Sequence, residues 1–257
     1  MRSTLHKILG LKAIRLLVVV LFWLGVWQIL SMAVGKEVLL PSPRATLSAL
    51  VKMAGSMDFY ISVAGSIVRV TVGYIFGVVI GVILGALSVW CGFAGMILSP
   101  LRSIIKATPV ASFIILAYMW LSKVQIPGVI ASLIVIPIIW SNVSEAILCV
   151  DKKKLECAKI FGLSFGKKLK YIYIPHIKPY FVAGALSSTG LAWKSGIAAE
   201  TLVDLSGSIG GRLYDSKIYL ESADLFALTG VVILLSVAIE KLFVGIMAGK
   251  GRKNDKV

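Results

Sequence analysis

Long runs of apolar residues without a charge, separated by short polar stretches, dominate this chain. They occupy residues 16–34, 70–101, 107–121, 124–144, 179–199 and 225–239, with a single lysine inside the fifth run. A helix needs about 20 apolar residues to cross a bilayer. Only helices and closed barrels satisfy their backbone polar groups in lipid, and runs this long favour helices. We therefore expect an all-α integral membrane protein with about six transmembrane helices.

Two of these runs depart from the simple pattern of one straight helix each. The second run is too long for one span, and Gly92, Gly95 and Pro100 predict that its helix turns near the end. The third run, residues 107–121, is short and needs its flanks to complete a crossing.

The composition agrees with a membrane protein. Of the 257 residues, 58% are hydrophobic, and the mean hydropathy is +0.93. Soluble domains are about 45–50% apolar, so a soluble protein of this composition would have too little polar surface. The length fits one compact domain of about five to seven spans with their loops.

Basic residues outnumber acidic ones, 27 to 12, which gives a net charge of +15. In a soluble protein this excess would suggest nucleic-acid binding. Here it lies in loops beside apolar runs, as the positive-inside rule describes, so we exclude a nucleic-acid partner. With six spans and the N-terminus inside, most basic residues fall on the inner side, including Arg102, Lys106 and the lysines after the fourth run. Both termini are therefore expected in the cytosol.

The N-terminal part is expected to hold an uncleaved span and an outer connector. Its apolar run is longer than the 7–15 residues typical of a signal peptide. Pro41 and Pro43 then break the helix. After them Leu47, Leu50 and Val51 recur at helical spacing, which indicates either a short amphipathic helix on the outer surface or a plain connector.

Cysteine and histidine provide no evidence for a metal site. Cys91, Cys149 and Cys157 show no C-x-x-C spacing, and an odd number does not make a disulfide framework. His6 and His176 lie far apart in the sequence. All five are interpreted as packing or loop residues.

Four glycines in the second run share one helix face, because each follows the last by four residues. They are Gly73, Gly77, Gly81 and Gly85. Such a strip lets another helix approach closely, since helices in lipid associate through packing. The strip is either a sliding surface between moving helices or a tight static contact.

A Lys-rich loop after the fourth run is predicted to fold into two short helices. Residues 155–161 can form the first, with Asp151 as its cap, and Gly162 can end it in the left-handed conformation. Ser164 can cap the second. Pro175 is expected to stop that helix and turn the chain into the fifth run.

The product would be a compact helical hairpin outside the membrane, spanning residues 149–178. Its apolar residues are Ile160, Phe161, Leu163, Leu169, Ile172 and Ile174. A knob of this kind fits a groove on another protein. The alternative is a solvated basic loop beside anionic lipid, but the glycine and proline spacing favours docking.

The same loop carries a motif close to the pattern E-A-A-x3-G-x9-I-x-L-P. The motif residues are Glu156, Cys157, Ala158, Gly162, Ile172, Ile174 and Pro175. On this motif the chain resembles the permease subunits of ABC importers, in particular the nitrate, sulfonate, taurine and bicarbonate group. Cys157 replaces the usual alanine and Ile174 the usual leucine, and both changes are mild. Glu156 is expected to orient the hairpin through hydrogen bonds.

Weaker matches to the same family extend over most of the chain. They are Leu40-Pro41-Ser42-Pro43, Ser66-Ile67-Val68-Arg69-Val70 with Gly73, Ala107-Thr108-Pro109, Leu191-Ala192-Trp193 and Ala198-Ala199-Glu200.

The resemblance implies a type I ABC importer permease fold with a cytosolic coupling-helix hairpin. It implies a multi-pass chain of a bacterial inner membrane that pairs with a second permease subunit as a homodimer. Two ABC ATPase subunits and an extracytoplasmic substrate-binding protein complete the implied complex. ATP and magnesium would bind the ATPase, so no cofactor is expected in this chain. The sequence has no G-x-x-x-x-G-K-[ST] loop, which agrees with a subunit that is not an enzyme.

Three segments follow from this assignment. Residues 1–66 form the N-terminal span and outer connector, residues 67–248 the permease core with the loop 149–178, and residues 249–257 a basic cytosolic tail.

Four residues are candidates for the translocation pathway: Lys194, Glu200, Trp193 and Pro109. A charge inside a span is costly and marks function by default. Lys194 either attracts an anionic solute or is paired with Glu200, another span or backbone carbonyls. Alternation between inward- and outward-facing states is implied by the family alone, and the stretch 106–112 and the fifth span are the best candidates for lining the pathway.

The expected cargo is a small solute, with Lys194 favouring an anion of the nitrate, sulfonate or taurine kind. The same machinery could carry a thiamine precursor, riboflavin or another metabolite instead. A self-sufficient secondary transporter or channel is opposed by the docking hairpin. A membrane enzyme is opposed by the lack of clustered His, Asp or Glu in the sequence.

Overall fold

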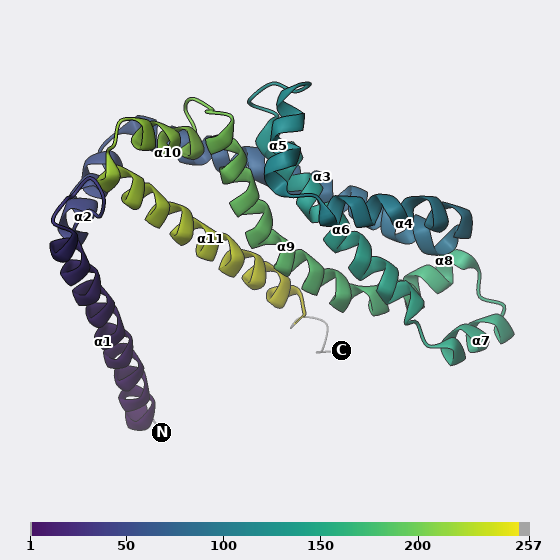
Figure 1. Ribbon diagram of the computed structural model, residues 1–257. Helices are drawn as coiled ribbons and strands as arrows, with labels where there is room; N and C mark the ends of the chain where they lie inside the picture. Colours follow the sequence, from purple (N-terminus) through teal and green to yellow (C-terminus); the bar gives the residue numbers. More distant parts are fainter. Residues whose placement is uncertain (1, 252–257) are drawn as a thin grey trace. The chain divides into compact units, whose positions relative to one another are not determined.

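The computed structural model describes residues 2–251, so the end of the predicted basic tail lies outside the described residues. All elements of this part are helices, in agreement with the predicted class (Figure 1). They are α1 (Arg2–Val34), α2 (Pro43–Ala54), α3 (Met57–Trp90), α4 (Gly92–Ala107), α5 (Val110–Tyr118), α6 (Ile126–Leu148), α7 (Lys152–Ile160), α8 (Phe165–Lys168), the π-helical segment η1 (Leu169–Tyr173), α9 (Ile174–Leu202), α10 (Ile209–Ile218) and α11 (Ser222–Gly251).

The helices group into two compact units. The described parts of Met1–Tyr60 and Arg212–Val231 form the first, and those of Ile61–Gly211 and Val232–Val257 form the second. In the first unit the segment before α2 folds back on α1, where Trp27 Nε1 donates to Pro41 O at 3.0 Å and Ser31 Oγ to Leu40 O at 2.9 Å. Ser42 Oγ then accepts from Ala45 N and begins α2, so the predicted helix after Pro43 is confirmed.

Four described helices are long and apolar enough to cross a membrane: α1, α3, α6 and α11. They correspond to the first, second, fourth and sixth predicted spans. α3 begins at Met57 and not near residue 70, because Ser62, Ser66 and Arg69 extend the helix with polar side chains that are not exposed. α3 ends at Trp90, where Cys91 is extended, so the turn predicted near Gly92 is confirmed.

The third predicted span, residues 107–121, needs its flank to complete a crossing, as expected. Its residues belong to a bent pair in which α4 and α5 meet at 101°, and together they make a fifth candidate span (Figure 1). The break falls at Thr108 and Pro109, both extended (ψ of 128° and 137°). A residue before proline is driven out of the helical region by the proline ring, which explains the position of the corner.

α9 is the fifth predicted span, and it is longer than expected. It runs for 29 residues from Ile174 to Leu202, enough for a crossing, but its composition is less apolar than that of the four helices. Charged and small polar residues both contribute to the difference, and of the latter Ser188 Oγ and Thr189 Oγ1 donate to Ala185 O within the helix. Such residues suit a central helix, and α9 packs extensively against α6.

A small hydrophobic core fixes α5 against the adjoining ends of α6 and α9. Its buried members are Ile114, Ala117, Ile126, Ile130, Ala199, Val203 and Leu205. The core therefore holds α5 at an angle to α4 and includes the first residues of the loop between α9 and α10.

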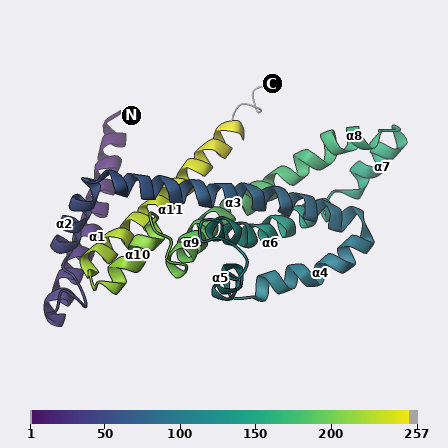
Figure 2. The same ribbon diagram turned by 90° about the horizontal axis from the view of Figure 1, so that it is seen from above.

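The glycine strip of α3 lies against α6, and Figure 2 shows the two helices running side by side. All four glycines are buried. A Cβ added to Gly73 would lie 2.0 Å from Gly128 O, and one added to Gly77 would lie 2.8 Å from Val135 Cβ. Gly81 and Gly85 approach the next turns of α6 equally closely. The strip thus provides a continuous surface on which α6 packs.

Gly73→Ala is expected to destabilise the protein by about 1–3 kcal/mol, because the new methyl group would overlap the backbone of Gly128. Alanine favours a helix over glycine, so any loss reports the clash. Thermal unfolding in mild detergent measures it. Gly25→Ala in α1 is the matched control, since a Cβ there meets nothing within 4 Å. Equal melting temperatures for the two variants would contradict the close packing.

Candidate functional site

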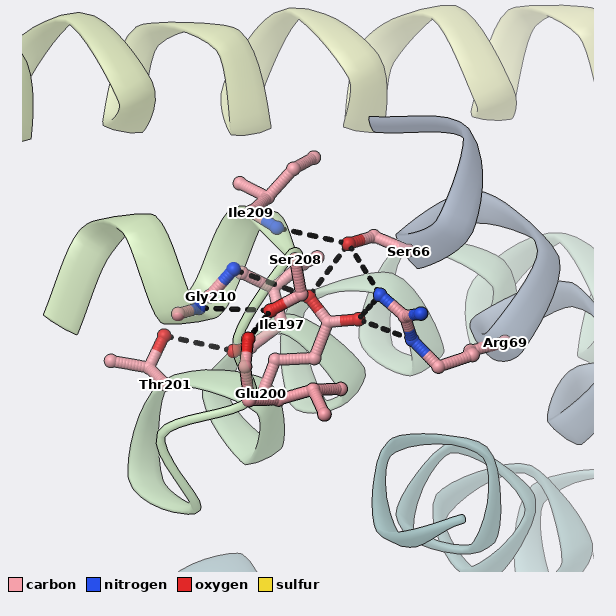
Figure 3. Close-up of polar contacts among 10 residues, drawn as sticks. Ser66, Arg69, Ile197, Glu200, Thr201, Ser208, Ile209 and Gly210 are labelled. Atoms are coloured by element: carbon pink, nitrogen blue, oxygen red, sulfur yellow. Dashed lines mark hydrogen bonds and ion pairs between the residues drawn. The ribbon is translucent and has the colours of Figure 1, made fainter. Parts of the chain in front are cut away.

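A buried ion pair joins α3 to α9 (Figure 3). Glu200, near the end of α9, is fully buried. Its Oε1 accepts from Arg69 Nε at 2.9 Å and lies 2.9 Å from Arg69 Nη2. Its Oε2 accepts from Ser66 Oγ at 2.7 Å. Ser66 and Arg69 are three residues apart and therefore share one face of α3.

The same cluster fixes the start of α10. Gly210 N donates to Glu200 Oε2 at 3.2 Å, and Ile209 N donates to Ser66 Oγ at 3.1 Å. These N–H groups belong to the first turn of a helix, where they have no partner within the helix itself. A Cβ on Gly210 would lie 2.3 Å from Glu200 Cβ, so only glycine permits this approach. Three helices thus meet at one carboxylate.

A buried ion pair of this kind determines geometry more than it adds stability. Moving both charges out of water costs several kcal/mol, and the attraction offsets this only when hydrogen bonds are complete. Both oxygens of Glu200 accept hydrogen bonds here.

The sequence pattern did not connect Glu200 with Ser66 and Arg69, which lie more than 130 residues away. The signal that could have found them is a serine and a cation at helical spacing beside a span.

The four pathway candidates are not brought into one site. Lys194 is exposed and makes no hydrogen bond or ion pair among the described residues, so its predicted pairing with Glu200 is absent there. Trp193 is buried, and its Nε1 donates to Val232 O at 3.0 Å. Pro109 is exposed at the corner between α4 and α5.

The Lys-rich loop forms a helical hairpin whose first arm is as predicted. Asp151 caps α7, accepting from Lys153 N at 2.9 Å. Gly162 has a φ of +62° and ends the arm in the left-handed conformation. Leu163 N donates to Ala158 O and Gly162 N to Lys159 O, the two bonds of a Schellman motif. The tip is therefore a defined turn.

The second arm differs from the prediction. α8, η1 and α9 follow one another without a break, so Pro175 does not stop a helix and lies in the first turn of α9. Proline is tolerated there because it directly follows a π-helical turn, where the bonding of the helix already departs from the regular pattern. In η1 the wider i→i+5 bonding shifts the register, and Ile174 N donates to Leu169 O.

The hairpin exposes apolar side chains at its tip. Ile160 and Phe161 are 82% and 79% exposed, and Phe165 is 60% exposed. Of the motif residues, Glu156, Cys157, Gly162, Ile174 and Pro175 are exposed, Ile172 is half-buried and Ala158 is buried. In contrast to expectation, Glu156 makes no hydrogen bond or ion pair with the described residues, so its carboxylate is available to a partner.

An aromatic cluster attaches the hairpin to α3. Trp90, the last residue of α3, meets Phe165 edge-to-face at 5.6 Å and Tyr173 at 6.1 Å. α3 therefore contacts the hairpin at one end, and 21 residues earlier (about 32 Å along the helix) it holds Glu200 through Arg69.

No group of three or more His, Cys, Asp or Glu that could hold a metal occurs among the described residues.

Comparison with known proteins places the chain among transport proteins. The family model described as "Binding-protein-dependent transport system inner membrane component" matches residues 77–250. A nitrate import permease protein of Synechocystis is 27% identical, over 84% of this chain and 81% of that protein. A putative aliphatic sulfonates transport permease protein of Bacillus subtilis is 22% identical, over 82% and 76%.

A solved structure shows the same fold. The MetNI methionine ABC transporter, in inward-facing conformations, aligns with a TM-score of 0.61 and 15% identity. The alignment covers 75% of this chain and 95% of the transporter chain. The predicted type I importer permease fold is therefore confirmed.

Arg69→Met is expected to destabilise the protein by about 3–5 kcal/mol, because it leaves the Glu200 carboxylate buried without its cation. Removing both charges with Arg69→Met and Glu200→Leu should recover a clear part of that loss. Unfolding in detergent measures all three proteins.

The control is Lys123→Met. Lys123 lies 4.0 Å from Asp204 in a pair that is 44% exposed on each side, and its loss should change stability by less than about 1 kcal/mol. If the double variant were as unstable as Arg69→Met alone, the pair would not be the reason for the loss.

Proposed function

Since the chain belongs to the family of binding-protein-dependent transport system inner membrane components, we propose that it forms the translocation pathway for a small anion of the nitrate, sulfonate or taurine type. The family itself establishes the coarser assignment. The chain is a multi-pass inner-membrane permease of an ABC importer, works with ATPase and binding-protein partners, and is not itself catalytic.

The hairpin between α6 and α9 is the observation that carries the proposed mechanism. Its tip presents Ile160 and Phe161 to solvent on a turn fixed by Gly162. Exposed apolar side chains on a rigid knob mark a surface that another protein covers. We assign Glu156, Cys157, Ala158, Gly162, Ile172, Ile174 and Pro175 to the docking of an ABC ATPase.

Movement of the docked hairpin can be transmitted directly to α3 through side-chain contacts. Trp90 packs on Phe165 and Tyr173 of the second arm, so displacement of that arm acts on the end of α3. α3 lies on α6 through its glycines and on α9 through Arg69 and Glu200. In this role Glu200 holds helices together, while Lys194, Trp193 and Pro109 stay candidates for lining the pathway.

The cargo is proposed from the relatives and from charge. The names of two relatives specify nitrate and aliphatic sulfonates, both anions. Lys194 adds an exposed cation without an acidic partner among the described residues of α9. A thiamine precursor or riboflavin in the same machinery is the second candidate, and transport without an ATPase is the third.

The complete complex is proposed to contain two copies of this chain, ATPase subunits that bind ATP and magnesium, and an extracytoplasmic binding protein. The proposed cytosolic position of both termini and the hairpin is supported by their basic residues. We retain residues 1–66, 67–248 and 249–257 as N-terminal segment, permease core and basic tail.

Gly162→Val is expected to abolish co-purification of an ATPase with the tagged chain in mild detergent. A β-branched residue cannot adopt the φ of +62° without strain, so the tip of the hairpin must change shape. Mass spectrometry of the purified complex gives the readout. Gly92→Val is the control, because Gly92 lies outside the hairpin in open space. Wild-type chain that purifies without any ATPase would oppose the docking hypothesis.

Lys194→Met is expected to reduce anion uptake about tenfold, as loss of one charge-assisted contact would, while the ATPase still co-purifies. Uptake of labelled nitrate, taurine and thiamine by cells containing the whole transporter separates the cargo classes. Lys194→Arg, which keeps the charge, should retain uptake. Normal uptake by Lys194→Met would remove Lys194 from the pathway, and uptake of thiamine alone would replace the anion proposal.

A further inference from the structure

A second cation lies at the corner of the bent pair α4 and α5. Lys106 is in the last turn of α4, and its Nζ donates to Ser141 Oγ of α6 at 2.8 Å. Ser141 Oγ donates to Pro137 O at 2.8 Å, which directs its lone pairs towards the lysine. The serine therefore holds the ammonium in place without neutralising it.

The depth of Lys106 along α6 is that of a transmembrane position. Ser141 precedes Leu148, the end of α6, by seven residues, or about 10 Å, and follows Ile126 by about 22 Å. The hydrocarbon core of a bilayer is about 30 Å thick. Lys106 thus contacts α6 inside a candidate membrane span, whereas the sequence pattern placed it on the inner side.

The charge of Lys106 has no counter-ion in the described part of the chain. Neither of the ion pairs found there includes it, and the residue is exposed. Its neighbour one turn earlier, Arg102, lies over the ring of Trp140 at 5.5 Å and is likewise without a carboxylate in those pairs. α4 therefore presents two cations towards α6 on one face.

The backbone next to Lys106 cannot face lipid. The helix is broken at Thr108 and Pro109, and Pro109 is exposed. Non-helical backbone at membrane depth is tolerated only where protein covers it or where it lines a water-filled cavity. A lysine at the same place has the same requirement, because a charge in hydrocarbon is costly. Both observations require that either a second protein chain or water covers this corner, and the exposed charge of Lys106, which has no carboxylate in the ion pairs of the described residues, favours an aqueous path.

We propose that Lys106, held by Ser141, is an anion-binding subsite of the translocation pathway. The subsite would bind a small oxyanion, such as nitrate or the sulfonate group of taurine, through the two N–H donors of the ammonium that Ser141 leaves free. The inference rests on the proposed anion transport and adds the residue that contacts the cargo. Two other roles for the charge are stabilisation of the α4 C-terminus and contact with lipid phosphate.

The first experiment tests the aqueous position independently of cargo. Lys106→Cys is made in a chain whose Cys91, Cys149 and Cys157 are replaced by serine, and is treated in membranes with a negatively charged, membrane-impermeant thiol reagent. Labelling is expected, with protection by nitrate or taurine. Leu21→Cys, in the apolar α1 and 58% exposed, is the control that should stay unlabelled. Absence of labelling at position 106 would overturn the proposal whatever the cargo.

The second experiment measures anions moved per ATP hydrolysed in proteoliposomes that contain the whole transporter. Lys106→Met should lower this ratio about tenfold. Lys106→Arg should keep most of it, and Lys123→Met, which removes an exposed cation paired with Asp204, should leave it unchanged.

Each alternative gives a different result. An unchanged ratio in Lys106→Met would overturn the subsite. Transport and hydrolysis that both stay at the wild-type rate would indicate contact with lipid phosphate, and a parallel fall of both rates would indicate a structural role at the end of α4. If the wild type hydrolyses ATP but moves neither nitrate nor taurine, the proposed cargo fails first and the subsite fails with it.

Discussion

Close contact between backbones, made possible by the absence of side chains, is the constraint on which the second unit depends. Lipid offers helices no hydrophobic reason to associate, so they hold together where their surfaces fit. Gly73 to Gly85 give α3 a face without side chains, and the carbonyl of Gly128 and the side chains of Val135, Ile139 and Val143 fill it. With α6 fixed on α3, and α9 packed on α6, the polar groups of three helices come within bonding distance.

The cluster around Glu200 is the polar counterpart of that packing. A carboxylate buried at this position would be prohibitively costly without Arg69, Ser66 and the N–H of Gly210. Because those donors come from separate elements, the cluster forms only when α3, α9 and the start of α10 are correctly placed. It therefore selects one arrangement, and the long α3 connects this arrangement with Trp90 at the hairpin.

The corner between α4 and α5 shows the reverse situation, because the packing there leaves the charge of Lys106 without a carboxylate partner among the described residues. Pro109 lies at the break between α4 and α5. The small hydrophobic core around Ile114 holds α5 at an angle to α4. Lys106 keeps Ser141 as its hydrogen-bond partner. The fold gives Arg69 both Glu200 and Ser66 as partners, whereas it leaves the charge of Lys106 with a serine alone. In a permease this contrast distinguishes Arg69, which stabilises the helix arrangement, from Lys106, which is available to bind the cargo.

The sequence alone determined the properties that depend on neighbours along the chain. Apolar runs specified helices of spanning length, glycine spacing specified a bare face, and Asp151 and Gly162 specified the first arm of the hairpin, because caps and left-handed turns are local. The tertiary structure decided which residues those features contact. Which helix covers the glycines, which cation pairs with Glu200, and how deep Lys106 lies all depend on contacts between distant segments. The bend at Pro109 and the continuous helix through Pro175 show the same limit, because the effect of a proline depends on the backbone around it, and a π-helical turn directly precedes Pro175.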